Sequence, residues 1–319
     1  MKSPAAHASA FICATAALLW TTSAWAVDLR EDPPEGALGV TAGLEYGFFS
    51  VSSFVDATGE SSDLVGDSSI SSMYVNLHAE YALPWVAGLH AGLDLPLVIN
   101  SATVDTGAGS SDASGTSIGD LSLFVGYWFP VVPKQLRVGG DLRFKLATGA
   151  APDGTLADDE AATGDGSNHI QLTAKADGTF EPGITAHVDA GYILTLGTTF
   201  SGFNADVNPG DVFFANLGVG YLIEQMVEPV LVLNFASAGS QELGPEGGTL
   251  TEVPNSAANF LALGIDVYVK INPMLKAKIG WGTSQIYNGL VLDRGGLLLS
   301  GENVFDGAAN FNVGVTGSF

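Results

Sequence analysis

The fold is decided by one stretch of eleven residues, Leu136-Arg137-Val138-Gly139-Gly140-Asp141-Leu142-Arg143-Phe144-Lys145-Leu146. Every second residue, starting from the first, is apolar or glycine, and three of the residues between them are basic. A β-strand points alternate side chains to opposite faces, whereas a helix would mix the two sets on its surface. The stretch is therefore predicted to be a strand with one apolar and one charged face.

The same alternation recurs along the chain, for example in residues 261–271, where Asp266, Tyr268 and Lys270 oppose a face of Leu, Ile and Val. Five connections between such segments are tight, and the other six exceed ten residues and are rich in Gly, Ser, Asp, Asn and Thr. An even strand number with loops sorted by length is typical of outer-membrane barrels. We predict an all-β, transmembrane antiparallel β-barrel of about 12 strands with short periplasmic turns and long extracellular loops. The predicted strands are 37–50, 70–83, 86–99, 117–130, 135–148, 168–181, 183–196, 211–224, 226–237, 257–271, 274–287 and 308–319.

Composition agrees with a membrane protein that is not helical. Of 319 residues, 46% are hydrophobic and only 14% charged, and 41 are glycine, which is costly inside helices. No apolar run after Val27 approaches the 18 residues of a candidate spanning helix. The formal net charge of −23 argues against nucleic acid as a partner, because such binding requires basic groups that displace counterions.

The N-terminus has the features of an export signal. Lys2 precedes an apolar stretch from Ala8 to Trp20, and Ala24-Trp25-Ala26 offers the small-x-small pattern of a cleavage site. We predict a signal peptide at 1–26, a short periplasmic extension at 27–36 and the barrel at 37–319. The only cysteine, Cys13, lies in the signal peptide, so the mature chain is expected to contain no disulfide and no thiolate ligand.

Placing the apolar faces against lipid fixes which strand residues face the interior. A Lys or Arg facing lipid would cost ~2–4 kcal/mol at the bilayer midplane, so the register is set by this penalty. The predicted lumen- or pore-lining residues are Glu45, Glu80, Asp94, Asp120, Arg137, Asp141, Arg143, Lys145, Lys175, Asp177, Asp189, Asp266, Lys270, Lys276 and Lys278.

The basic members of this set form two stripes, one on segments 135–148 and 168–181 and one on segments 257–271 and 274–287. Two interpretations remain open: an internal ion-pair network that packs a narrow barrel, or a polar pore whose field is set by the two stripes. With ~4.8 Å strand spacing and ~40° tilt, the backbone cylinder would be about 24 Å wide and the pore at most roughly 10 Å.

Aromatic residues collect near the ends of the predicted strands, as in the interfacial girdles of membrane barrels. Those near short turns are Tyr81, Trp85, Trp128, Phe129, Phe180 and Tyr221, and those near long loops include Phe48, Phe200 and Phe213. The chain ends on Phe319 after an alternating apolar series, which resembles the signal read by the outer-membrane assembly machinery. That machinery, outer-membrane lipid and lipopolysaccharide are the expected partners, together with a small-molecule solute.

No catalytic, metal or cofactor site is predicted. The four histidines after the signal peptide, His78, His90, His169 and His187, all have inward parity, and no nucleophile elbow or paired-histidine metal motif is present. His169 with Asp165 and Asp211 is the one candidate for a rim hydrolase, and a polar rim role is the preferred interpretation. The acidic stretch 153–165 matches no calcium loop, so we expect a solvated loop.

From about Ser117 onward the sequence resembles the outer-membrane barrel family named for the MetA pathway of phenol degradation, a neighbour of the FadL-type channels. The resemblance is carried by Ile118-Gly119-Asp120-Leu121, by residues 144–149 (FKLATG), by Gly164-Asp165-Gly166-Ser167-Asn168 and by Asn208-Pro209-Gly210-Asp211. The sequence departs from the family at Ala147, where Pro is usual, at His169, where Asp is usual, and at Gly317, where Tyr is usual.

The resemblance implies passive uptake of small, often aromatic or hydrophobic molecules. The expected function is therefore an outer-membrane channel without its own energy source. Two alternatives stay open: an anion-selective porin that uses the two basic stripes, and a barrel with a structural or surface-interaction role. The region before residue 37 is too short for the N-terminal plug of FadL-like channels.

Overall fold

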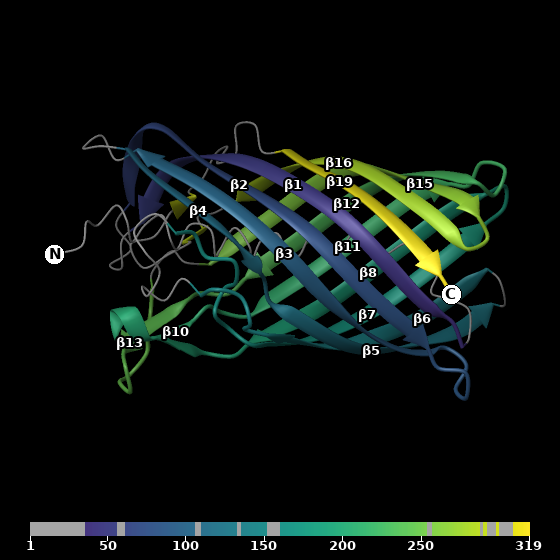
Figure 1. The fold of residues 1–319 in the computed structure, drawn as a ribbon, viewed down its shortest axis with the longest axis horizontal. Helices are drawn as coiled ribbons and strands as arrows, with labels where there is room; N and C mark the ends of the chain where they lie inside the picture. Colours follow the sequence, from purple (N-terminus) through teal and green to yellow (C-terminus); the bar gives the residue numbers. More distant parts are fainter. Residues whose placement is uncertain are drawn as a thin grey trace.

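The computed structural model describes residues 36–55, 61–105, 110–132, 135–151, 160–253, 257–287, 290–291, 298–299 and 309–319. These residues form a closed antiparallel β-barrel, in which each wall strand pairs with its neighbours in the chain and β1 also pairs with β19 (Figure 1). The predicted signal peptide, its cleavage site and most of the 27–36 extension lie outside the described residues.

Twelve strands make up the wall, as the sequence predicts. They are β1 (Leu38–Val55), β2 (Ser61–Ala82), β3 (Leu89–Asp105), β4 (Ser110–Ile118) continued by β5 (Leu121–Val132), β6 (Leu136–Leu146), β7 (His169–Phe180), β8 (Ile184–Thr195), β11 (Val212–Tyr221), β12 (Val227–Ala238), β15 (Ala258–Asn272), β16 (Leu275–Tyr287) and β19 (Ala309–Ser318).

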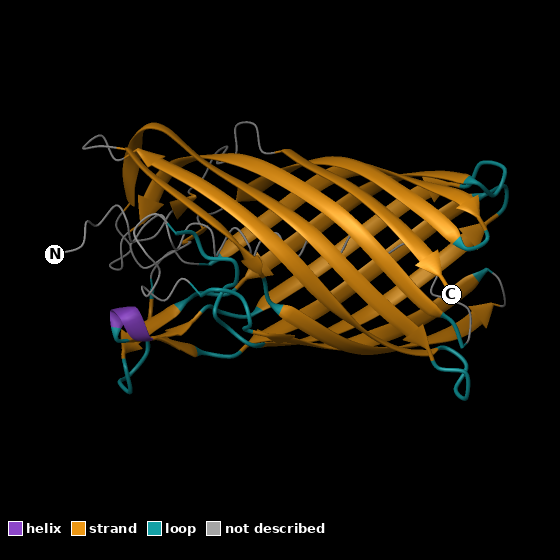
Figure 2. Ribbon diagram, in the orientation of Figure 1, coloured by secondary structure: helices purple, strands orange, loops and turns teal. Residues whose placement is uncertain are grey.

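Short turns gather at one end of the barrel and longer connections at the other (Figure 2). The first and last wall strands meet at the short-turn end. There the Leu38 amide donates to the Phe319 carbonyl at 2.9 Å, and the Phe319 amide donates to the Leu38 carbonyl at 2.8 Å. This reciprocal pair joins the first wall strand to the last, so that the cylinder has no free edge there.

Side-chain exposure alternates along the wall strands with the predicted parity. On β5, Leu123, Val125 and Tyr127 are exposed. Phe124 and Trp128, which have the opposite parity, are buried. Large apolar side chains are exposed at the outward positions of the wall strands, and the charged residues predicted to face the interior are buried or partly buried. Among the described residues, no helix is both long and apolar enough to cross a bilayer.

Two regions predicted as loops are extensions of paired strands. β1 and β2 stay paired out to Val55 and Ser61, and β3 pairs with β4 out to Asp105 and Ser110. Their Ser, Gly and Asp content resembles that of a loop, yet a long hairpin satisfies its backbone groups whatever its side chains. The predicted strand 117–130 is interrupted at Gly119 and Asp120, which divides it into β4 and β5.

The loop end carries a small second sheet of β9 (Thr198–Phe200), β10 (Ala205–Asn208), β13 (Glu242–Pro245) and β14 (Thr251–Glu252), with the short 3-10 helix η2 (Ser201–Phe203) and the separate pair β17 (Leu290–Val291) and β18 (Leu298–Leu299). Phe200 packs with Val207 inside this small sheet, so its expected place in an aromatic girdle is wrong. Trp128 also leaves the girdle, because its position on β5 turns it inward.

Candidate functional site in the barrel interior

The interior wall from β2 to β8 repeats one arrangement, a carboxylate held between a basic side chain and a histidine ring. Asp94 of β3 contacts Arg143 of β6, and its other oxygen lies 2.6 Å from Nδ1 of His78 on β2. The opposite ring nitrogen of His78 lies 3.3 Å from Glu80. Asp94, Arg143 and His78 come from three different strands, so the group joins β2, β3 and β6 across the wall.

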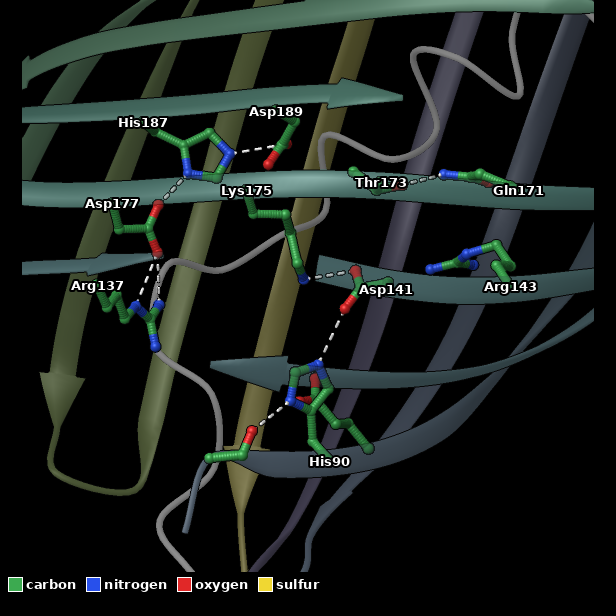
Figure 3. A network of polar contacts seen from close by, with 12 residues as sticks. His90, Arg137, Asp141, Arg143, Gln171, Thr173, Lys175, Asp177, His187 and Asp189 are labelled. Atoms are coloured by element: carbon green, nitrogen blue, oxygen red, sulfur yellow. Dashed lines mark hydrogen bonds and ion pairs between the residues drawn. The ribbon is translucent and has the colours of Figure 1, made fainter. Parts of the chain in front are cut away.

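A second group lies nearer the short turns. Lys175 of β7 places Nζ 2.5 Å from Asp141 of β6, whose other oxygen lies 3.2 Å from Nε2 of His90 (Figure 3). His90 is only 3% exposed, and its Nδ1 is 3.3 Å from the Gly88 carbonyl. Gly126 leaves the space that Asp141 and His90 occupy, since a side chain there would overlap both.

A third group is built on Asp177 of β7. Arg137 donates from Nε and from a terminal nitrogen to one Asp177 oxygen, at 2.9 and 2.6 Å. His187 of β8 contacts the other oxygen and, through Nε2, lies 2.9 Å from Asp189 (Figure 3). Charge-assisted bonds of this kind are about twice as strong as neutral ones.

Aromatic rings on β5 lie beneath these cations. The Arg137 guanidinium is 4.0 Å from the centroid of the Trp128 ring, and Lys175 Nζ is 4.9 Å from the same ring. Phe124 lies under Arg143 at 4.8 Å and stacks on His78 with a centroid distance of 5.3 Å. The cations thus have both a carboxylate and an aromatic face as partners, which fixes their positions more firmly than an ion pair alone.

A fourth group lies toward the loop end and includes a residue from a loop. Lys145 contacts Asp165 and lies 3.0 Å from Asp120, and His169 Nε2 lies 3.1 Å from Asp165. Burial would raise the pKa of the Asp165 carboxyl, but Lys145 and His169 hold it below its usual value. Asp165 is therefore buried and ion-paired, and the expectation that it belongs to a solvated loop is wrong; residues 152–159 of that stretch lie outside the described residues.

The hydrolase hypothesis for His169 loses its third member in this geometry. Asp211 instead accepts the Tyr192 hydroxyl at 2.6 Å and the Thr195 amide at 3.0 Å. His169 and Asp165 are buried beside Lys145, so they form part of a structural ion-pair group. Among the described residues, no cluster of His, Cys, Asp and Glu has the arrangement of a metal site.

The second basic stripe lies on β15 and β16. Lys278 is 2% exposed and its Nζ lies 2.9 Å from Asp266, which is 5% exposed. Lys270 and Lys276 are backbone partners nearer the short turns, and both are partly exposed. Glu45 of β1 is 2% exposed on the same inner side. In the first stripe, every cation contacts a carboxylate at close range.

The predicted interior residues thus lie on the buried side of their strands. Sequence reasoning missed which side chains contact one another there. It did not pair any cation with its carboxylate, and it did not include Phe124 and Trp128. Their shared parity on β5 was the available signal for the two rings. Parity predicts the inward direction of the histidines, but not that His78 and His187 each bridge two carboxylates on neighbouring strands.

A pocket of about 310 Å³ lies inside the short-turn end of the barrel. Its lining includes the Arg137–Asp177 pair and the buried Glu228, which contacts Thr185. Gln135, Pro130 and Leu222 also line it. Its volume falls at the low end of the range of small-molecule sites, and its lining offers both fixed donors and fixed acceptors.

Comparison with known proteins identifies the fold. No protein-family model and no curated protein matches the sequence of this chain. An outer-membrane channel from Pseudomonas putida F1 is similar in structure, with a TM-score of 0.67 and 13% identity over 92% of this chain and 98% of that chain. The translocator domain of autotransporter NalP from Neisseria meningitidis has a TM-score of 0.53 and 12% identity over 96% of this chain and 95% of that chain. The fold of this chain is therefore that of the outer-membrane β-barrels.

Proposed function

We propose that the protein is a passive channel of the bacterial outer membrane for small solutes. One observation carries this proposal: the barrel is closed, with an apolar outer surface and a charged inner surface. Such a cylinder is stable only where lipid surrounds it and polar groups are accommodated within. Export through a signal peptide cleaved near Ala26, and assembly guided by Phe319, complete this proposal.

The proposed solutes are small, flat aromatic or hydrophobic molecules. The resemblance to the phenol-degradation family suggests them, and the interior chemistry supports the aromatic class. Guanidinium groups stack on aromatic faces, and Arg137 already does so on Trp128 beside the pocket. Long aliphatic chains would gain little from this wall, because it consists of ion pairs and histidine rings.

Conductance and uptake test the proposal. Refolded protein in planar bilayers should give single-channel currents, and aromatic acids should block them at lower concentrations than fatty acids or acidic sugars. Arg137→Gln should weaken the block by aromatic acids. Asp206→Asn, which also removes one charge but lies in the loop sheet, is the control and should leave the block unchanged. A folded barrel that gives neither current nor solute uptake in liposomes would rule the proposal out.

An anion-selective porin is the second candidate, and the β15–β16 stripe favours it. Lys270, Lys276 and Lys278 place three cations on two neighbouring strands, and Asp266 is the carboxylate beside Lys278. Reversal potentials in a salt gradient decide this alternative. A preference for anions that is lost in Lys276→Glu would support it, and an unchanged reversal potential would remove it.

A further inference from the structure

We propose that residues 160–165, called the inner segment from here on, form the narrowest part of the interior at the loop end and so limit the size of solutes. This inference rests on the proposed channel function. It assigns a positioning role to Asp120, Lys145 and Asp165, which hold the inner segment in place.

The inner segment lies on the interior face of β3 and β4. Asn100 has inward parity on β3, is fully buried, and donates from Nδ2 to the Ala162 carbonyl at 2.6 Å. The inner segment starts at the edge of β4, where Glu160 and Ser114 form a parallel β-bridge and the Ala161 amide donates to the Ser114 carbonyl at 3.0 Å. Gly115 allows this close approach, because any side chain at Gly115 would overlap the Ala161 carbonyl. The backbone of the inner segment therefore lies against the inside of the wall.

Asp120 anchors the inner segment through three donors. Its carboxylate accepts the Gly149 amide at 2.9 Å and the Asp165 amide at 3.2 Å, and it lies 3.0 Å from Lys145 Nζ. Lys145 also contacts the Asp165 side chain. The loop that begins after β6 and returns before β7 is thus tied at both ends to one carboxylate at the break between β4 and β5.

Further contacts make this arrangement rigid. Ala150 donates its amide to Thr163 Oγ1 at 3.0 Å, and its carbonyl accepts the Thr163 and Gly164 amides, both at 3.0 Å. Residues 161–165 are all buried. Moving the inner segment would separate the buried Asp165 carboxylate from Lys145, which is costly. The geometry describes a fixed narrowing and not a mobile gate.

The short glycine-rich motifs of the sequence have a structural role at the inner segment. Gly119 and Asp120 form the break in the wall, Gly149 and Gly164 lie at the Asp120 carboxylate, and Asp165 completes the ion pairs. A side chain at Gly164 would lie 2.5 Å from an Asp120 oxygen. These short glycine-rich motifs are far apart in the sequence, yet they meet at this one point and position the same stretch of backbone.

The size of the effect follows from chain dimensions. One extended chain occupies ~4.8 Å next to its neighbour, so it would narrow a pore of at most roughly 10 Å to about 5 Å, and moving it away would increase the cross-section roughly 2- to 4-fold. Single-channel conductance should rise by the same factor, and larger sugars should pass in liposome swelling assays.

Two variants displace the inner segment by different means. Gly115→Val pushes the Ala161 carbonyl away without changing charge, and Asp165→Asn weakens the contact with Lys145. Asp206→Asn, which makes the same chemical change in β10, is the control and should conduct as the wild type does. Displacement itself is measured separately: with Cys13→Ser in the background, Ala162→Cys should resist a thiol reagent in the otherwise wild-type chain and react when Gly115→Val is added.

Each outcome is decisive. Increased conductance in both variants, relative to a conducting wild-type barrel, supports the inference. Thiol exposure of position 162 with wild-type conductance and size limit overturns it. So does conductance that changes in Asp165→Asn alone, because that would be an effect of charge. If all variants stay silent while position 162 becomes reactive, the channel function itself is refuted together with the inference.

Discussion

The outward face of β12 allows the membrane assignment to be tested with one substitution. Leu231 lies near the middle of β12, is 59% exposed, and is flanked by outward Val219 and Ile265 on the neighbouring strands. If lipid surrounds this position, Leu231→Lys should lower the free energy of unfolding by ~2–4 kcal/mol. That range corresponds to a folding equilibrium ~30- to 900-fold less favourable.

The assay is reversible denaturant unfolding in lipid vesicles, followed by tryptophan fluorescence. Asn234→Lys, on the inner face of the same strand, should cost far less, because the added ammonium meets polar surroundings. Leu231→Ala separates the loss of apolar contact from the charge. If Leu231→Lys and Asn234→Lys were equally stable, lipid would not contact the apolar face, and the membrane register argued from the alternation would be refuted.

Three other predictions concern the interior. Lys278→Met should destabilise the protein by about 3–5 kcal/mol, because it leaves Asp266 buried without its cation, and adding Asp266→Leu should restore much of the loss in the same unfolding assay. Trp128→Leu removes a ring shared by two cations and should cost about 1–2 kcal/mol, with a loss of emission from a buried indole. The lowered pKa of Asp165 predicts stability that is complete above the unfolded carboxyl value of about 3.9 and declines as pH falls below it; this decline should be shallower in Asp165→Asn.

Strand register was predictable because a single large energy determines it. Placing Arg137, Arg143 or Lys145 against lipid would cost more than any local preference could offset, so parity alone gives the direction of each side chain. The cost of placing a charge against lipid does not predict where each strand ends. In β1 and β2 near Val55 and Ser61 the sequence no longer alternates in polarity, although the backbone pairing continues.

The ion-pair groups were beyond sequence reasoning for a different reason. Parity places Asp94, Asp141 and Arg143 inside, but it does not say which faces which across a curved wall. Asp94 and Arg143 are 49 residues apart, and Arg143 reaches past β5 to contact β3. Asp165 was harder still, because a loop residue has no strand parity, and only its contacts with Asp120 and Lys145 show that it lies within the barrel.

Pairing within the wall has a consequence for selectivity. A cation within hydrogen-bonding distance of a carboxylate acts on a passing ion as a dipole, whose field falls off faster than that of a free charge. The stripe on β6 and β7 consists entirely of such pairs, with Asp94, Asp120, Asp141, Asp165 and Asp177 as the acidic members. Its contribution to anion preference should therefore be small, so that Arg143→Gln should leave the reversal potential close to the wild-type value. A clear loss of anion preference in Arg143→Gln would mean that the pairs open in the conducting state. If the pairs stay closed, this wall discriminates solutes by size and shape more than by charge.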